Sequence, residues 1–363
     1  MSTNTIRAAV IGLGVGGAHL RGYQVAPGVE IVGICDSNPA RLAEIGEKHN
    51  LPESVYFTDY ETLFKEAKPT LVSIALPNAL HAPVSIAAMA AGADVLCEKP
   101  LAMTSAEVHE MVKTAEHYGR RLMVSYNHRY RADVFWIRRL MAEGRLGRIY
   151  QIEASWRRET GIPGWGWFGS QAMSGGGAMI DLGVHVLDMA LWLLDYPKVV
   201  SVNGATRSLF GKRGQKVWGE ARWLKDASSV FDVDDGGIGF LRLGTGVTMV
   251  LQATWAEHKM PNEDLIRLEI QGSEGTAILS VPNYTKQDTV TFYTEIGGAP
   301  VTVTPHIRWD GHWFHERLIA EIVTAIQTDT PPPTTGEQGL VGVQVIEAIY
   351  HAAQSGREVV FPG

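Results

Sequence analysis

The chain lacks the features that mark secreted, membrane-spanning or nucleic-acid-binding proteins. Its 363 residues include only two cysteines, Cys35 and Cys97. Both fall at the ends of predicted strands, which favours free buried thiols in a reducing compartment over a disulfide. An excess of basic residues is also missing, since 32 Lys and Arg stand against 39 Asp and Glu, a net charge of −7. This balance argues against nucleic acid or an anionic membrane as a partner.

Long apolar runs are scarce as well. No run reaches the roughly 20 residues of a membrane span, and the N-terminal Met-Ser-Thr-Asn-Thr has neither the basic nor the apolar region of a signal peptide. We therefore expect a cytoplasmic protein. With 45% hydrophobic residues the chain can bury a sizeable core, and its length predicts two domains.

The first third of the chain alternates short apolar runs with amphipathic helical patterns. Such alternation is typical of a parallel, doubly wound sheet, and we predict a Rossmann dinucleotide-binding domain over residues 1–125. Strands are expected at 7–11, 30–35, 71–75, 94–97 and 122–125, and helices near 15–25, 38–49, 59–66, 79–91 and 104–118.

The remaining residues, 126–363, change character. After a helix near 131–143 come longer alternating runs with Gly-rich turns, which predict antiparallel hairpins. The fold class is thus α/β, with a second α+β domain for substrate binding and oligomerisation built on a large, mostly antiparallel open sheet. An uncovered sheet face carrying Met249 and Leu251 would need a partner, so we expect a homodimer or homotetramer. The elements expected here are strands at 247–255, 265–271, 276–281 and 289–293 and helices near 314–328 and 337–355.

A glycine-rich loop follows the first predicted strand and opens a helix. In Gly12-Leu13-Gly14-Val15-Gly-Gly17 the first glycine allows a tight turn, the second lets the backbone approach a pyrophosphate, and the third permits close helix–strand packing. We expect the loop, including Leu13 and Val15, to hold a dinucleotide at the helix N-terminus. The alternative is a glycine-rich turn without a ligand.

Asp36 ends the second predicted strand, 19 residues after Gly17. Its carboxylate can accept hydrogen bonds from both ribose hydroxyls and would repel a 2′-phosphate, which favours NAD over NADP. A helix-capping aspartate is the alternative.

Two further turns should lie at the carboxyl ends of strands, where ligands bind on such sheets. Leu76, Asn78 and His81 follow one strand and are candidates for ribose or nicotinamide contacts, or else a helix cap and a solvated helix start. Glu98-Lys99-Pro100 follows the next strand, and Lys99 there can stabilise developing alkoxide charge. Pro100 could adopt the cis form and aim the lysine, although X–Pro bonds are mostly trans.

Asp181 and His185 lie four residues apart, on one face of a predicted helix. The imidazole can accept a hydroxyl proton, and a neighbouring carboxylate raises its basicity. Gly175–Gly177 would give a ligand access to the helix N-terminus, whereas Asp188 is expected to be structural. A third ligand at close spacing is missing, so we expect no metal.

Aromatic residues crowd the segment before this helix. Trp165 and Trp167 can stack on the C–H face of a pyranose or cyclitol ring, and Arg158 could bind hydroxyls or a carboxylate. Packing at a domain interface is the alternative for these tryptophans.

The glycine loop, Glu98-Lys99-Pro100 and the Gly-Gly-Gly…Asp181-x-x-x-His185 segment together resemble the Gfo/Idh/MocA family, which includes glucose–fructose oxidoreductase and inositol dehydrogenase. The resemblance covers nearly the whole chain. It implies that Lys99 polarises the reacting oxygen, His185 is the acid/base, and Asp181 binds substrate. It also implies that Asn127 lies near nicotinamide and His128 near substrate, although inositol dehydrogenases would carry an arginine at or beside the His128 position.

The function expected from these observations is an NAD-dependent dehydrogenase that oxidises a secondary hydroxyl of a sugar, sugar derivative or cyclitol. Two alternatives are an NAD(P)H-dependent reductase or tightly bound-cofactor oxidoreductase, and a non-catalytic dinucleotide-binding sensor. A sensor has no need of Lys99, Asp181 and His185, which favours the enzyme.

Overall fold

The computed structural model describes residues 5–226, 229–309, 311 and 314–362, which form two compact units. Each unit is composed of two separate segments of the chain. Unit 1 comprises Met1–Tyr130 and Gly311–Val343, and unit 2 comprises Arg131–Asp310 and Gln344–Gly363.

This division differs from the expected ranges 1–125 and 126–363, because residues 311–343 return to unit 1. The physical reason is the packing of helix α9 (Phe314–Thr328) on helix α1 (Gly16–Val25). A Cβ at Gly22 of α1 would lie 2.6 Å from Ile319 Cδ1, so the missing side chain lets the two helices approach closely. Leu318 and Ile322 of α9 complete the same core cluster.

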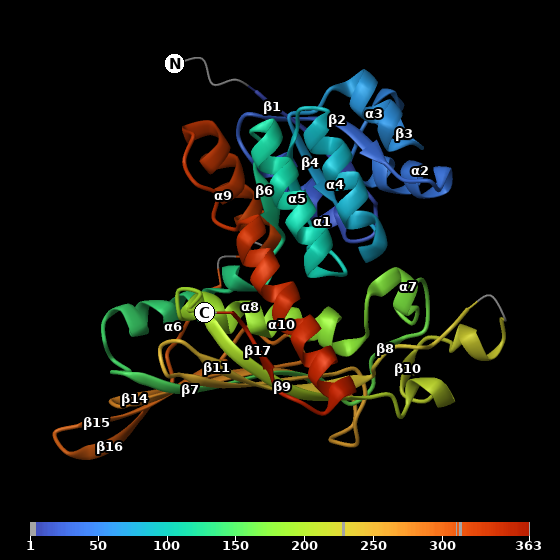
Figure 1. Cartoon of the computed structure of the whole chain (residues 1–363). Coiled ribbons are helices and arrows are strands. Elements are labelled where there is room, and N and C mark those ends of the chain that lie inside the picture. The colour runs from blue at the N-terminus through green and yellow to red at the C-terminus, as the bar shows by residue number, and fades with distance from the viewer. Residues whose placement is uncertain (1–4, 227–228, 310, 312–313, 363) are drawn as a thin grey trace. The chain divides into compact units, whose positions relative to one another are not determined.

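Unit 1 contains a six-stranded sheet in the order β3-β2-β1-β4-β5-β6, and every pairing is parallel (Figure 1). The strand order reverses between β1 and β4, which creates the switch point where doubly wound sheets bind ligands. The strands are β1 (Ile6–Ile11), β2 (Val29–Cys35), β3 (Tyr56–Phe57), β4 (Leu71–Ile74), β5 (Asp94–Cys97) and β6 (Leu122–Val124).

The helices of unit 1 follow from clear local signals. Helix α5 (Ser105–Tyr118) begins with a capping box, in which Thr104 and Glu107 satisfy each other's backbone N–H groups. Its C-cap is Gly119, which has a φ of +60°. Both cysteines are buried and free, as expected. Besides α1, α5 and α9, the helices are α2 (Pro39–Lys48), α3 (Tyr60–Ala67), α4 (His81–Ala90) and the N-terminal part of α10 (Gly336–Ser355).

Unit 2 contains a nine-stranded sheet in the order β16-β15-β14-β13-β7-β12-β11-β9-β17. Its pairings are antiparallel except that of β7 with β12. The mostly antiparallel open sheet is therefore confirmed. Its strands are β7 (Ile149–Arg158), β9 (Val199–Arg207), β11 (Gly236–Leu243), β12 (Thr248–Thr254), β13 (Asp264–Gly272), β14 (Gly275–Pro282), β15 (Val290–Ile296), β16 (Ala299–Val303) and β17 (Val359–Val360).

Helices cover one face of this sheet (Figure 1). Met249 and Leu251 of β12 are fully buried. The expectation that they lie on an uncovered face is wrong, because β12 packs against the turn that precedes helix α8 (Val184–Leu193), where Gly183 faces Ala253. Ile238 and Phe240 pair with Gln252 and Val250, which alternate with Leu251 and Met249 along β12. The exposed Ile238 and Phe240 therefore lie on the other face. The helices of unit 2 are α6 (Ala132–Ala142), α7 (Gln171–Ser174), α8 (Val184–Leu193) and the C-terminal part of α10 (Gly336–Ser355). A small second sheet pairs β8 (Ile162–Pro163) with β10 (Val217–Trp218).

Within the described residues, one helical stretch is long and apolar enough to cross a membrane, Gln171–Leu193, although no such run was expected. Of its most apolar window, 89% is buried inside the protein. This burial is typical of a core helix.

Candidate active site

The glycine loop joins β1 to α1 and passes close to the end of β4. Gly12 has a φ of +87°, and a Cβ there would lie 2.3 Å from the carbonyl oxygen of Ala75, so only glycine fits. Gly14 is exposed, and a Cβ there would meet nothing within 4 Å among the described residues. Helix α1 begins without a side-chain cap. Its first N–H groups therefore lack a side-chain acceptor, and a phosphate could accept hydrogen bonds from them.

Two residues of this loop differ from the roles expected of them. Gly16, not Gly17, is the packing glycine, because a Cβ at Gly16 would lie 2.8 Å from Val10 Cγ1 whereas one at Gly17 meets nothing within 4 Å. The side chain of Leu13 is fully buried, so only its backbone can face a ligand, while Val15 is exposed.

Asp36 is fixed beside this loop by two backbone groups. Its Oδ2 accepts a hydrogen bond from Leu13 N at 3.1 Å, and its Oδ1 accepts one from Asn38 N at 2.9 Å. The helix cap of α2 is Asn38, whose side chain accepts from Ala40 N, rather than Asp36. The carboxylate thus stands at the end of β2, next to the turn that Gly12 makes.

His81 connects two turns at the carboxyl edge of the sheet. Its Nδ1 lies 2.7 Å from the carbonyl oxygen of Pro100, and its Nε2 lies 2.8 Å from that of Leu76. Burial lowers the pKa of His81, against the hydrogen bonds to these carbonyls. Both ring nitrogens face backbone carbonyls, and the neutral ring donates to one of them, which favours a structural role for His81. Asn78 is buried at the start of the same turn.

Lys99 follows β5 directly. Its peptide bond to Pro100 is cis, the less common of the two forms that the sequence left open. The side chain of Lys99 is half-buried. The backbone N–H of Lys99 donates to Glu98 Oε2 at 3.2 Å. The Glu98 carboxylate thus fixes the backbone of the turn that carries Lys99.

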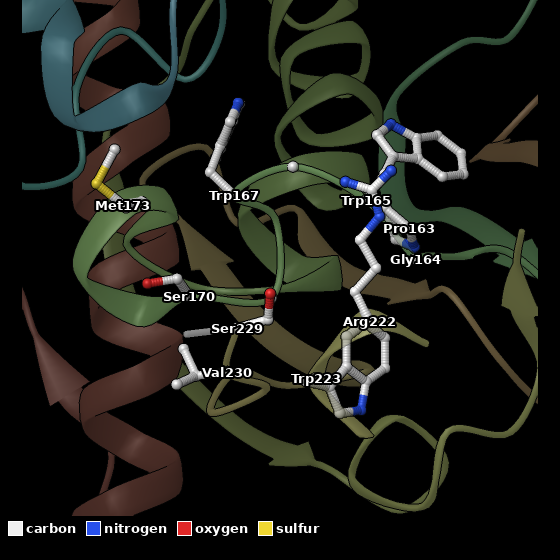
Figure 2. Close-up of a pocket in the computed structure, with 12 residues that line it drawn as sticks. Pro163, Gly164, Trp165, Trp167, Ser170, Met173, Arg222, Trp223, Ser229 and Val230 are labelled. Atoms are coloured by element: carbon white, nitrogen blue, oxygen red, sulfur yellow. The ribbon is translucent and has the colours of Figure 1, made fainter. Parts of the chain in front are cut away.

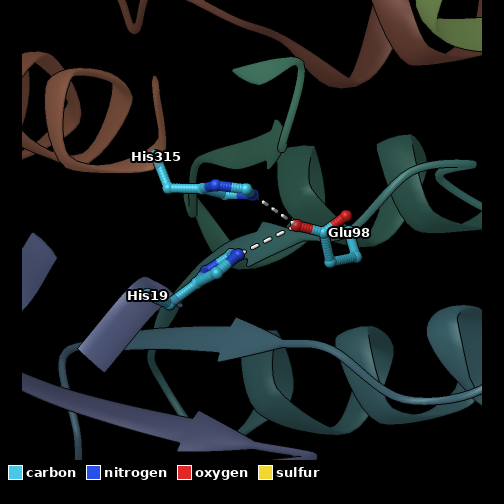
Figure 3. Close-up of side chains that lie close together, drawn as sticks. All are labelled: His19, Glu98 and His315. Carbon is cyan, nitrogen blue, oxygen red and sulfur yellow. Dashed lines mark hydrogen bonds and ion pairs between the residues drawn. The ribbon is translucent and has the colours of Figure 1, made fainter. Parts of the chain in front are cut away.

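Glu98 is itself held by two histidines of unit 1, His19 and His315 (Figure 3). Its Oε1 lies 2.9 Å from His19 Nε2 and 3.7 Å from His315 Nε2. Burial alone would raise the pKa of the Glu98 carboxyl, but hydrogen bonds from the two imidazoles and their charge hold it well below its usual range. The carboxyl is therefore an anion.

Asn127 and His128 lie in the short helical turn Asn127–Tyr130 that follows β6. Both are buried. Asn127 Nδ2 lies 3.4 Å from His315 Nδ1, and the ring of His128 lies 5.8 Å from that of Phe314. Helix α9 thus reaches the turn that the resemblance assigns to nicotinamide and substrate.

In unit 2, Asp181 and His185 lie where a π-helical turn, Met179–Gly183, runs into α8. Asp181 Oδ2 accepts a hydrogen bond from Trp255 Nε1 at 2.9 Å. The ring of the buried His185 lies 5.4 Å from that of Trp156. Tyr196 donates to Asp188, which is the structural role expected for that carboxylate.

The expectation that Gly175–Gly177 opens the helix N-terminus to a ligand is wrong. Asp234 fills that position, since its two carboxylate oxygens accept from Gly177 N at 2.7 Å and Met179 N at 3.0 Å. A Cβ at Gly177 would lie 1.7 Å from the Asp234 carbonyl oxygen, and one at Gly176 would lie 2.2 Å from the Tyr350 hydroxyl. The glycines make room for this internal cap. Burial raises the pKa of Asp234, against the hydrogen bond that Tyr350 donates to it.

Arg158 is buried beside the same aromatic cluster. Its Nε donates to Asp264 at 2.9 Å, and its guanidinium lies 5.2 Å from the ring of Trp156 and 4.5 Å from that of Trp218. Burial would lower the pKa of Arg158, but Asp264 raises it above its usual value. The guanidinium is thus a fixed cation near Asp181.

Trp165 and Trp167 line a surface cavity of about 250 Å³ in unit 2 (Figure 2). Trp165 is 46% exposed, and Trp167 stacks on Phe168 with 4.4 Å between ring centres. Arg222 and Trp223 line the cavity from a short helix distant in sequence. The cavity is therefore rich in indole rings with one guanidinium, a lining suited to a polar ring ligand.

Several residues that build these sites were not predicted from the sequence. Trp255 and Asp234 belong to loops that carry no motif, and their roles depend on pairings across the sheet of unit 2. His315 lies far from the glycine loop in sequence. Of these residues, only His19 could have been noticed in the sequence, because a histidine stands there at a buried position of helix α1.

Comparison with known proteins agrees with this arrangement. Residues 6–126 match the model of an oxidoreductase family with an NAD-binding Rossmann fold, and residues 135–278 match the GFO/IDH/MocA C-terminal domain. A relative from Amycolatopsis mediterranei (strain S699), whose name describes an oxidoreductase subunit, is 34% identical over 76% of this chain and 75% of its own length. The chain belongs to the Gfo/Idh/MocA family of oxidoreductases.

Two other known proteins match the chain along almost its entire length. D-glucoside 3-dehydrogenase of Escherichia coli (strain K12) is 29% identical over 362 residues, 99% of this chain and 98% of its own. The solved structure of levoglucosan dehydrogenase in complex with NADH and levoglucosan superposes with a TM-score of 0.83 at 24% identity, covering 99% of this chain and 100% of that one. The similarity to levoglucosan dehydrogenase supports the fold alone.

Proposed function

We propose that the protein is an NAD-dependent dehydrogenase that oxidises a secondary hydroxyl of a sugar, sugar derivative or cyclitol. The observation that carries this proposal is the hydrogen bond between Leu13 N and Asp36 Oδ2, which joins the glycine loop to the carboxylate expected to bind ribose. Full-length similarity to D-glucoside 3-dehydrogenase supports the substrate class.

The residues of unit 1 fit a dinucleotide. Gly12 forms a tight turn that has no room for a side chain. Helix α1 begins with N–H groups that no side chain caps, and Asp36 lies at the end of the neighbouring strand. Gly14 and the backbone of Val15 would hold the pyrophosphate, while Asp36 would accept from both ribose hydroxyls and exclude a 2′-phosphate. Bound NAD supplies the hydride acceptor for the carbon that is oxidised.

The proton and the oxygen of the reacting hydroxyl are handled by side chains. His185, whose ring lies 5.4 Å from that of Trp156, accepts the hydroxyl proton as general base. Lys99 stabilises the negative charge that develops on the same oxygen. Asp181, held by Trp255, binds a neighbouring hydroxyl and favours the protonated imidazole. The net change is alcohol to carbonyl, with one hydride and one proton removed.

Aromatic and polar side chains of unit 2 support a ring substrate. Trp165 and Trp167 offer indole faces to C–H groups, and Arg158 holds a fixed positive charge near Asp181. From unit 1, His128 would contact substrate hydroxyls. These features favour a cyclic polyhydroxy compound over a linear alcohol.

A direct test is to follow reduced-nicotinamide absorbance while the protein and NAD are incubated with a substrate panel. The panel should contain a methyl glucoside, levoglucosan and myo-inositol, with a linear alcohol and a 2-hydroxy acid as controls. We expect turnover with at least one ring compound and the highest kcat/KM there. A linear alcohol or 2-hydroxy acid as the best substrate would contradict the proposal.

A further inference from the structure

Three potential metal ligands come together in unit 1 from segments far apart in sequence (Figure 3). His19 lies in α1, Glu98 follows β5, and His315 lies in the first turn of α9. One ligand atom from each lies within 4.8 Å of the other two. The side chain of His19 is fully buried, and those of Glu98 and His315 are 10% and 17% exposed. The cluster is therefore shielded from bulk water.

The outer nitrogens of both imidazoles are already engaged. His19 Nδ1 lies 2.9 Å from Ser73 Oγ, which in turn lies 2.6 Å from the hydroxyl of Tyr23. On the other side, His315 Nδ1 lies 3.4 Å from Asn127 Nδ2. Metal-binding histidines show this pattern, in which one nitrogen faces a polar neighbour and the other faces the ion.

The amide of Asn127 supports the same orientation. Its Oδ1 is buried and has no hydrogen-bond partner among the described residues. The two ends of an amide are assigned from the hydrogen-bond network. Exchanging them turns Oδ1 toward His315 Nδ1, which then donates a proton to it. The lone pair of His315 Nε2 would consequently point at Glu98, as that of His19 does when His19 Nδ1 donates to Ser73.

Without an ion, the two Nε2 atoms face Glu98 as N–H donors. In the orientation described above they present lone pairs instead, and these repel the carboxylate oxygen unless a cation lies between them. A divalent ion would satisfy all three groups at once. In a tetrahedral zinc site with bonds of about 2.0–2.1 Å, donor atoms lie roughly 3.3 Å apart. The separations of 2.9 and 3.7 Å from Glu98 Oε1 to the two Nε2 atoms bracket this value.

The donor set selects the kind of ion. Two imidazoles and one carboxylate suit Zn²⁺ and related transition metals, whereas Mg²⁺ and Ca²⁺ prefer oxygen ligands throughout. We propose that His19, Glu98 and His315 bind a divalent transition metal, with Zn²⁺ the best-matched ion, leaving a fourth position for water. This differs from the expectation of no metal, because the three residues meet only in the folded chain.

Such an ion would join α9 to α1 and to the turn that carries Lys99. Glu98 could bind it through Oε1 and keep the hydrogen bond from Lys99 N on Oε2. The site is therefore structural in the first instance, and it does not depend on the proposed dehydrogenase activity.

The test uses the full-length chain, treated with a chelator and dialysed, without NAD or substrate. Titration with ZnCl₂ in a calorimeter should show one ion per chain, and the melting temperature should rise with added Zn²⁺. His315→Gln and His19→Gln should each weaken binding by at least about tenfold, the lower end of the effect of second-shell changes at metal sites. His109→Gln, on the exposed face of α5, is the matched control.

Co²⁺ gives a readout that does not depend on the variants folding. Added to the chelator-treated wild type, one equivalent should produce the visible absorption of a low-coordinate nitrogen–oxygen site, and Zn²⁺ should bleach it. Absence of stoichiometric Zn²⁺ binding by the wild type, or equal binding by His315→Gln and His109→Gln, would overturn the proposal. The three side chains would then be a protonated hydrogen-bonded cluster only.

Discussion

At the scale of single residues, Asp36 should decide which dinucleotide is used. Asp36→Ser removes the charge that repels a 2′-phosphate and the acceptors for the ribose hydroxyls. Hydrogen bonds to charged groups contribute about 1.5–3 kcal/mol, so we expect kcat/KM for NAD to fall by roughly 10- to 100-fold and that for NADP to rise. Parallel assays with the two cofactors measure this change. A wild type that prefers NADP would show that Asp36 does not face the 2′ position.

The acid–base role of His185 makes an equally direct prediction. His185→Ala should lower kcat by about 100- to 10,000-fold, the usual contribution of general acid–base catalysis. Lys99→Ala should cause a loss of similar size. Circular dichroism and NAD binding should stay close to wild type, and His117→Ala on the exposed surface of α5 is the control. A loss below about tenfold would remove His185 from this role.

His81 predicts how stability depends on pH. Burial lowers its pKa from the usual value of 6.5, so the unfolded chain binds the extra proton as the pH falls. The stability due to neutral His81 is therefore present above about pH 6.5 and is lost below it. Urea denaturation at about pH 7.5 and 5.5 should show a smaller difference in unfolding free energy for His81→Gln than for wild type. Equal differences would mean that His81 takes up its proton in the folded state as well.

At the scale of elements, the glycine loop provides a matched pair of variants. Gly16→Ala would place a Cβ 2.8 Å from Val10 Cγ1, whereas Gly17→Ala meets open space. We expect Gly16→Ala to lower the free energy of unfolding by about 1–3 kcal/mol, the cost of overpacking. Gly17→Ala should be neutral or slightly stabilising, since alanine favours helix. Equal effects in thermal melts would contradict this assignment of the packing glycine.

Local pattern predicted most of the regular elements. The first strand, expected at 7–11, spans Ile6–Ile11, and the last long helix, expected near 337–355, spans Gly336–Ser355. Apolar periodicity and turn residues determine these elements, and both can be read in a short window. The Rossmann order and the open antiparallel sheet followed from the same signals.

Long-range pairings were not predictable in this way. The cap that Asp234 provides for the turn at Gly177 joins two segments separated by more than a whole strand, and no local pattern records it. The π-helical turn at Met179–Gly183 likewise depends on packing against β12. At the candidate site, the types and order of the residues identified Lys99, Asp181 and His185 as candidates. The residues that hold them, such as Trp255, became visible only in the structure.

At the scale of the whole molecule, one face of the nine-stranded sheet predicts self-association. Ile238 and Phe240 of β11 are exposed there, 45% and 38%, and Phe240 pairs with Val250 on the adjacent strand. Apolar side chains on a broad sheet face favour a partner. Light scattering should show a dimer or tetramer, and Phe240→Lys should dissociate it. Val25→Lys at the exposed end of α1 is the control. A wild-type monomer at micromolar concentration would contradict the prediction.

The return of α9 to unit 1 has a consequence for synthesis on the ribosome. The nucleotide-binding core is not closed when residues 1–130 have emerged, because the face of α1 around Gly22 still lacks Leu318 and Ile319. That apolar face stays open while all of residues 131–310 are translated. A nascent chain of this protein should therefore attract chaperones for most of its elongation time, and a truncated gene that ends before α9 should yield aggregated product.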